Sequence, residues 1–323
     1  MSGRREFIAT ALAALGTSSL LAAGDRHEGP GQADAGRRAA THARNGESLN
    51  ASGHAALTSH PALSIQQVID LLLADIPGAP FPQTVDTIKS GDPSWPVKGI
   101  VTTMFATDAV IEKTIQLGAN FIIAHEPTFY NHTDETSWLE GDRVFRFKKD
   151  LLDKHQIVVW RFHDGWHTHR PDGIRMGVLS ALGWEKYYDA AQPQVVTIPV
   201  LSLGDLIKHA KKQMAIDKVK VIGDLAQSCQ RIVIMPGAGG GKAQIQSLQK
   251  YNPDCLICGE LNEWETAEYI RDARYQGGKT SLLVLGHSVS EEPGMQWLIP
   301  VLQPKVPGIR ITHIPSGDPF QTI

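Results

Sequence analysis

The chain has 323 residues, of which 42% are hydrophobic and 20% charged, and 31 basic against 34 acidic side chains leave a net charge of −3 at pH 7. This length buries a large core in one or two domains, and the aliphatic content excludes disorder of the whole chain. The near-neutral balance argues against nucleic acid as the main partner. Three cysteines are too few for a disulfide framework, and no interior stretch is apolar over the roughly 18 residues of a membrane span.

Residues 1–23 have the three-part layout of a secretory signal. Arg4 and Arg5 are followed by an apolar run from Phe7 to Ala23 that ends in small residues. The paired arginines resemble a twin-arginine signal, which implies export of a folded protein to the periplasm. The alternative is an amphipathic start to the fold.

Residues 24–62 are rich in Ala, Gly, Arg, Ser and His and show no hydrophobic period, which predicts a disordered linker. They hold four of the 13 histidines, so a metal-scavenging tract is an alternative, although the spacing is irregular. We expect the folded domain to span 63–323, with no stable membrane span once the signal is removed.

From residue 63 the sequence alternates short β-branched runs with amphipathic segments, which predicts βαβ crossovers and a mixed, largely parallel α/β fold of two similar halves. Ser64 is a suitable N-cap for the first helix. Strands are expected at 99–104, 121–124, 157–161, 231–235, 254–258 and 281–285. Helices are expected at 107–117, 138–154, 174–182, 202–214, 243–250 and 263–275, before a final helix and strand.

Four of these strands run directly into polar residues. Ligands bind beyond the carboxyl ends of strands in open α/β sheets, so these four ends are expected to converge on one cleft. Imidazole and carboxylate groups together suit Zn, Fe, Mn or Ni rather than an all-oxygen Ca or Mg cage. The residues concerned are His125 and Glu126, the stretch 163–169, Gly259 and Glu260, and His287 with Glu291 and Glu292.

Two other signals carry less weight. Cys255 and Cys258 resemble a metal or redox pair, but residues i and i+3 of a strand point to opposite faces, so both are expected in the core. The glycine-rich stretch 236–242 resembles a phosphate loop, yet Ala243 replaces the Ser or Thr that would bind Mg²⁺. We expect a tight backbone turn there, with anion contact as the lesser alternative.

The four polar stretches resemble the motifs of the NIF-three-like family of dinuclear-metal-centre proteins. The similarity runs from about residue 63 to 320. The resemblance implies two metal ions per chain, a hexameric ring and an activity of the GTP cyclohydrolase type two class. An exported protein would meet little GTP, so the small-molecule substrate is not readable from the sequence.

The ligand set that the resemblance implies departs from the family at two positions. The second histidine of the family is Glu126 here, and its aspartate is His167. Three histidines and two carboxylates are therefore kept, with an unchanged ligand charge of −2, which favours retention of both metals. Asp164 or Asp172 supplies the missing carboxylate if the loop is threaded differently. The implied ligands are His125, Glu126, His167, His287 and Glu291.

These residues predict a metal-dependent hydrolase, in which two metal ions would activate a bridging water. Glu291 is the candidate bridge, and Glu260 and His163 are the candidate catalytic residues, Glu260 as a proton shuttle. His163 and His169 are also candidates to support the ligands or to contact substrate, with a structural role as the alternative. Trp166 and Trp264 are pocket-lining candidates, with core burial as the default. The alternative is a non-catalytic metal-binding or protein-interaction scaffold, and either protein is expected to be a homo-oligomer.

Overall fold

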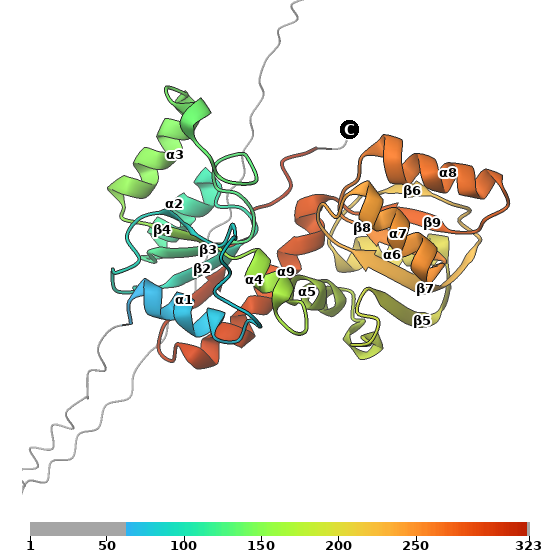
Figure 1. The fold of residues 1–323 in the computed structure, drawn as a ribbon, viewed down its shortest axis with the longest axis horizontal. Coiled ribbons are helices and arrows are strands. Elements are labelled where there is room, and N and C mark those ends of the chain that lie inside the picture. The colour runs from blue at the N-terminus through green and yellow to red at the C-terminus, as the bar shows by residue number, and fades with distance from the viewer. Residues whose placement is uncertain (1–62, 322–323) are drawn as a thin grey trace, which may run out of the picture. The chain divides into compact units, whose positions relative to one another are not determined.

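The computed structural model describes residues 63–321, so the predictions for 1–23 and 24–62 lie outside the described residues. The described residues all belong to one compact unit. They form two five-stranded sheets, each with helices on both faces (Figure 1). The predicted mixed, largely parallel α/β fold is therefore confirmed.

The first sheet has the strand order β1-β4-β3-β2-β10. Strands β10, β2, β3 and β4 run parallel to one another, and β1 pairs with β4 in the antiparallel direction at the edge of the sheet. The strands are β1 (Ile88–Ser90), β2 (Ile100–Thr103), β3 (Phe121–Ala124), β4 (Val158–Arg161) and β10 (Ile311–His313).

Alternate residues of this sheet supply two cores. Ile123 packs with helices α1 and α9, whereas its neighbour Ile122 packs with α2 and α3. This is the two-residue period of a strand buried on both faces. Ser64 caps the first helix in a capping box: its Oγ accepts from the Gln67 backbone N–H, and the Gln67 side chain accepts from the Ser64 backbone N–H. The helices are α1 (Ile65–Leu73), α2 (Asp108–Gln116), α3 (Arg143–Lys154) and α9 (His287–Leu302).

The second sheet has the order β5-β7-β8-β9-β6, with antiparallel strands at both edges. Cys255 lies in the core under α5 and α6, and Cys258 lies in the opposite core under α7 and α8, which confirms that the two thiols face apart. The strands are β5 (Val195–Ser202), β6 (Lys220–Ile222), β7 (Ser228–Met235), β8 (Cys255–Cys258) and β9 (Ser281–Val284). The helices are α5 (Gly173–Ala181), α6 (Leu203–Gln213), α7 (Gly241–Tyr251) and α8 (Glu268–Tyr275).

Helix α9 leaves the second sheet after β9 and packs on the first sheet, and it crosses α5 on the way (Figure 1). Gly177 and Gly294 make this crossing close, because a Cβ on Gly177 would lie 2.4 Å from the Gly294 Cα. The first turn of α9 therefore comes within reach of the carboxyl ends of the first sheet.

The predicted helix at 138–154 is wrong at its start. Residues Ser137–Leu139 form a separate 3-10 turn, Gly141 has a φ of +91°, and Asp142 caps α3. The predicted helix at 263–275 begins with a π-helical turn, Glu263–Ala267. Strands β1, β5 and β6 were not predicted. All three are edge strands. β1 and β6 have only three residues each, and buried and exposed residues do not alternate regularly along β5, so no hydrophobic period marks them.

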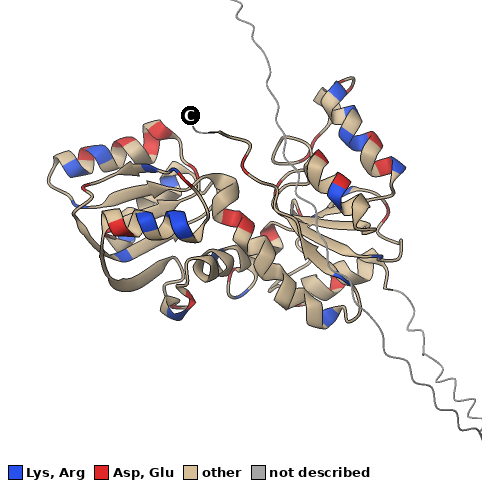
Figure 2. Cartoon of the chain, turned by 180° about the vertical axis from the view of Figure 1, so that it is seen from behind, with Lys and Arg blue, Asp and Glu red and all other residues tan. Residues whose placement is uncertain are grey.

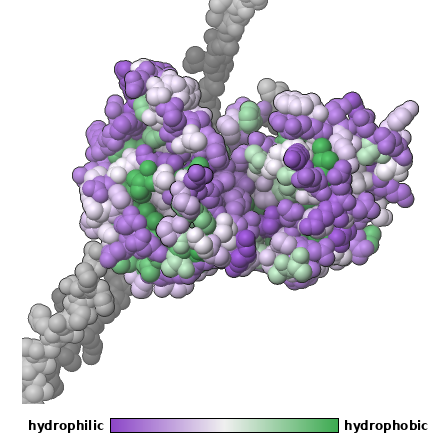
Figure 3. Space-filling model, viewed as in Figure 1, coloured by the Kyte–Doolittle hydropathy of each residue, from purple (hydrophilic) through white to green (hydrophobic). Residues whose placement is uncertain are grey.

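The surface carries charges of both signs, which alternate along α3 and α8 (Figure 2). The face drawn in Figure 3 is mainly hydrophilic, with apolar side chains in separate small spots. No helix within residues 63–321 is long and apolar enough to span a membrane.

Candidate metal centre

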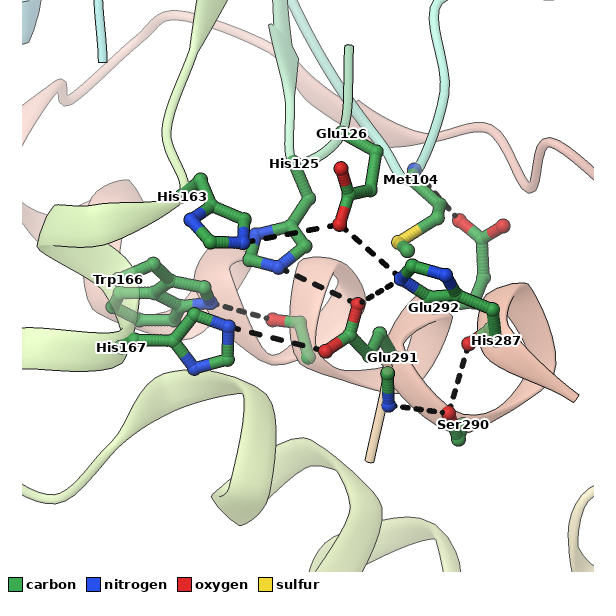
Figure 4. Close-up of polar contacts among 12 residues, drawn as sticks. Met104, His125, Glu126, His163, Trp166, His167, His287, Ser290, Glu291 and Glu292 are labelled. Carbon is green, nitrogen blue, oxygen red and sulfur yellow. Dashed lines mark hydrogen bonds and ion pairs between the residues drawn. The ribbon is translucent and has the colours of Figure 1, made fainter. Parts of the chain in front are cut away.

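Three chain segments bring the predicted ligands together (Figure 4). His125 and Glu126 directly follow β3, and His163 and His167 belong to the turn around the short helix α4 (Asp164–Thr168) after β4. His287 begins α9 after β9, and Glu291 is one helical turn further, so both side chains lie on one face of the helix. The five predicted ligands and His163 therefore meet in one place.

Three imidazoles are held in the same way, each by its Nδ1 atom. The partner is the Phe162 carbonyl oxygen for His125 (3.1 Å), Asp164 for His163 (2.9 Å) and Asp172 for His167 (3.2 Å). Metal-binding histidines characteristically engage their second nitrogen in this way, which fixes the ring and its tautomer. One ligand atom of each ring lies within 4.8 Å of those of the other two.

His125 has a buried ring nitrogen, Nε2, that lacks a hydrogen-bond partner within residues 63–321. A carbonyl oxygen only accepts hydrogen bonds, so Nδ1 carries the proton and Nε2 holds a lone pair. Nε2 has no hydrogen-bond partner among the described residues and lies 3.6 Å from Glu291 Oε2, another acceptor. Complete burial, then the charges of His167 and His163, keep the pKa of His125 well below its usual range. Two acceptors facing each other in the interior call for a cation between them.

Glu291 reaches several imidazoles with its two oxygens. Its Oε2 lies 3.1 Å from His287 Nε2 and 3.6 Å from His125 Nε2, and its Oε1 lies 3.9 Å from His167 Nε2. The side chain is almost fully buried. This central place suits the bridging role that the sequence suggested.

His287 lies between two carboxylates, 3.2 Å from Glu126 and 3.1 Å from Glu291. Burial opposes the charged form, but the hydrogen bonds to Glu126 and Glu291 outweigh it and raise the pKa of His287 to about 10. Without a bound cation, this imidazolium balances part of the carboxylate charge. Glu260, the predicted proton shuttle, is half exposed and lies on the other side of the ring, 3.4 Å from Nδ1.

Glu126 is shared between the centre and a buried arginine. Its Oε1 points to His287 and His163, whereas its Oε2 accepts a hydrogen bond of 3.0 Å from Arg161 Nη2. Arg161 is fully buried and also donates to the carbonyl oxygens of His125 and His132. Only one oxygen of Glu126 is therefore open to a metal ion.

The two alternative aspartates serve the histidines instead of pointing into the centre. Asp164 accepts hydrogen bonds from Thr84 Oγ1 (2.8 Å) and Val85 N, as well as contacting His163. Asp172 holds His167 and caps α5. Sequence reasoning missed Asp86, whose carboxylate accepts the backbone N–H groups of residues 163, 164 and 165 and so fixes the start of α4. It lies in an irregular segment, where no motif marks it.

The glycine-rich segment forms the predicted tight turn. Gly237 has a φ of +66° and donates its N–H to Ser290 Oγ at 2.9 Å, which brings the turn against α9. At the start of α7 the N–H of Gly241 donates a hydrogen bond of 3.2 Å to the Glu265 carboxylate. The place for an anion at this helix end is thus taken by a side chain of the protein itself.

A pocket of about 770 Å³ opens onto the centre. This volume suits a small molecule. Its wall includes five of the six clustered residues, but neither tryptophan candidate: Trp166 is fully buried and donates to the Gly294 carbonyl oxygen, and Trp264 is 75% exposed. His169 packs beside Trp166, away from the cluster. The clustered residues in the wall are Glu126, His163, His167, His287 and Glu291.

Known proteins share this fold and sequence pattern. The GTP cyclohydrolase 1 type 2 homolog of Escherichia coli K12 is 25% identical over 204 residues, 62% of this chain and 78% of that protein. The hypothetical protein SA1388 of Staphylococcus aureus has a TM-score of 0.65 at 17% identity and covers 81% of this chain and 100% of its own. A Bacillus cereus protein related to NIF3 has a TM-score of 0.64 at 16% identity, over 81% and 99% of the two chains. The model of the family Duf34/NIF3 (NGG1p interacting factor 3) matches residues 86–319, and the chain belongs to this family.

Proposed function

We propose that the chain is a metal-dependent hydrolase that holds two divalent transition-metal ions and acts on a small-molecule substrate. One observation carries the proposal: the His125 Nε2 lone pair is buried, unpartnered within residues 63–321, and faces the Glu291 carboxylate at 3.6 Å. A metal ion satisfies both acceptors, and the fixed rings of His163 and His167 offer further lone pairs beside it.

Three glutamates have separate candidate roles in the proposed centre. Glu291 is the candidate bridge, since both of its oxygens face imidazoles, and Glu126 offers one oxygen while Arg161 holds the other. Bound divalent ions would lower the pKa of a water and polarise a carbonyl or phosphoryl oxygen. Glu260 contacts the outer nitrogen of His287, where it can accept or pass on a proton.

Metal stoichiometry by elemental analysis of the full chain tests the proposal. We expect about two metal ions per chain in the wild type and in His155→Ala, which removes an exposed histidine outside the centre. His125→Ala should lose most of the metal. Less than roughly half an ion per chain after reconstitution would overturn the two-metal proposal.

A panel of carboxylic esters, amides, phosphate esters and GTP then tests catalysis in the loaded protein. Turnover that disappears with the metal supports the hydrolase. Full metal loading without turnover on any of these compounds favours the alternative, a non-catalytic metal-binding or interaction protein.

We also propose export to the periplasm by the twin-arginine route and assembly as a homo-oligomer. The arginine pair at residues 4 and 5 supports the first, and the hexameric ring that the resemblance of the sequence motifs implies supports the second. Cell fractionation of the wild type beside an Arg4→Lys/Arg5→Lys variant, and light scattering of the purified chain, test the two proposals.

A further inference from the structure

Lys148 is a buried lysine in the wall of the pocket that opens onto the metal-centre candidates. It comes from α3, is only 6% exposed, and donates one hydrogen bond of 3.0 Å to the Thr128 carbonyl oxygen. An ammonium group has three N–H donors, so two are left for another partner. Because burying a charged amine is costly, lysine is seldom buried without an acid beside it.

Two acidic side chains favour the charged ammonium without taking up its donors. Burial lowers the pKa of Lys148, and the charges of Asp108 and Asp134 oppose that effect. Neither forms an ion pair with Lys148 within residues 63–321, and Asp134 is instead paired with Lys89 at 3.1 Å. The ammonium group thus keeps two donors that form no hydrogen bond within residues 63–321.

Thr128 is a second, independent sign of a ligand. It lines the same pocket and is 1% exposed, yet its Oγ1 has no hydrogen-bond partner in the described part of the chain. A buried hydroxyl without a partner carries a desolvation cost that a bound ligand removes. Thr128 follows Glu126 by two residues, so their Cα atoms are at most about 7 Å apart.

Tyr130 completes this end of the pocket. Its ring centroid lies 4.6 Å from Lys148 Nζ, and its backbone has a φ of +65°, which is unusual for a bulky residue. Such backbone strain gathers at ligand-binding segments. The strained segment thereby places one aromatic face beside the open ammonium group.

The rest of the wall favours a ligand with an apolar body and one anionic group. Phe105, Pro127, Pro236 and Pro319 line the pocket. A carboxylate has two acceptor oxygens, which one ammonium group and one hydroxyl can serve, whereas a phosphate group has three and a larger charge. Besides Glu126 and Glu291 of the metal centre, the pocket wall includes one acidic residue, Asp318, which is exposed to solvent.

We propose that Lys148 and Thr128 bind the carboxylate of a small substrate or product whose apolar body fills the pocket toward Glu126. The substrate class is therefore an ester or amide that carries a carboxylate. This inference rests on the proposed hydrolase for the reaction, but the binding itself requires neither metal nor turnover.

Calorimetric titration of the full chain with phenylacetate tests the subsite, in metal-loaded and in metal-free protein. The neutral isostere phenylacetamide is the ligand control. Lys148→Met removes the ammonium group, and Lys149→Met is the matched control, because Lys149 is the next residue, half exposed and paired with Asp153. Thr128→Val removes the hydroxyl, and Lys148→Arg keeps the charge.

We expect phenylacetate to bind the wild type and Lys149→Met alike, and Lys148→Met about tenfold or more weakly. Thr128→Val should weaken binding, Lys148→Arg should restore a measurable part, and phenylacetamide should not distinguish the lysine variants. Should Lys148→Met not fold, the phenylacetate affinities of Thr128→Val and Lys148→Arg test the subsite.

The subsite is overturned by the absence of phenylacetate binding, by equal binding to Lys148→Met, or by equal affinity for phenylacetamide. Loss of binding in metal-free protein also overturns it, since the anion would then lie on the metal. If the chain holds little metal but still discriminates by Lys148, the hydrolase fails and the subsite stands.

Discussion

Gly237 lies against the carboxylate of Glu291, so closely that a Cβ on Gly237 would be 2.0 Å from Glu291 Oε1. The backbone also has a φ of +66°, a conformation that costs other residues about 1 kcal/mol or more. Glycine at this position thus lets the turn after β7 support the central carboxylate of the cluster.

Gly237→Ala is therefore expected to displace Glu291 and to reduce bound metal by half or more, as measured by elemental analysis. Gly239→Ala is the matched control, because its Cβ would meet only the end of the Met235 side chain, at 3.2 Å. Equal metal content in both variants would contradict the role of this contact.

Arg161 is expected to be needed for stability. Its guanidinium is fully buried, and Arg161→Met leaves the Glu126 carboxylate only the imidazolium of His287, which it shares with Glu291. Removing one partner of a buried ion pair typically costs about 3–5 kcal/mol. Urea unfolding of metal-free protein measures this loss. Combining Arg161→Met with Glu126→Gln should recover part of it, because the unpaired charge is then gone. A loss below roughly 1 kcal/mol in the single variant would show that the pair is dispensable.

The crossing of α5 and α9 predicts a steric effect. A Cβ on Gly177 would lie 2.4 Å from backbone atoms of Gly294, so Gly177→Ala should destabilise the fold by about 1–3 kcal/mol or more. The control is Ser180→Ala on the exposed side of α5, where alanine favours the helix. Thermal unfolding compares the two, and equal melting temperatures would show that the helices separate at little cost.

The buried thiol of Cys258 predicts a pH effect. Burial raises its pKa from 9.0 to about 12. Because the unfolded thiol ionises first, the stabilising contribution is complete below pH 9 and is lost as the pH rises toward 12. Relative to Cys258→Ala, the wild type should lose about 1.4 kcal/mol per pH unit above pH 9. Unfolding free energies measured from pH 8 to 10.5 check this, and parallel curves would contradict it.

The sequence was sufficient for the parts of the fold with regular patterns. β3 and the core of β4 are continuous apolar runs, and Ser64 caps its helix as predicted. Three-residue edge strands such as β6 show no such pattern, since one side faces solvent. The break before α3 depends on Gly141 and Asp142, which periodicity alone does not reveal.

The clustering of the predicted ligands followed from their positions at strand ends, but their individual partners did not. Arg161 lies in a β-strand, and only the folded chain shows that it holds Glu126. His163 was expected beside the centre, whereas its ring is as close to His125 as that of His167 is. Such distances depend on how α4 is anchored by Asp86, a residue nearly eighty positions away.

Glu292, next to Glu291 on α9, accepts hydrogen bonds from two segments that are distant in the sequence. Its Oε1 accepts from Met104 N, and its Oε2 accepts from the backbone N–H and hydroxyl of Ser316, which lines the pocket. The pocket wall thus joins segments from Phe105 to Pro319. During synthesis, residues 125 and 126 emerge long before residue 291, so the centre cannot close on a partly made chain. A metal acquired at this centre would therefore report that the chain has been made and folded at least as far as Glu291.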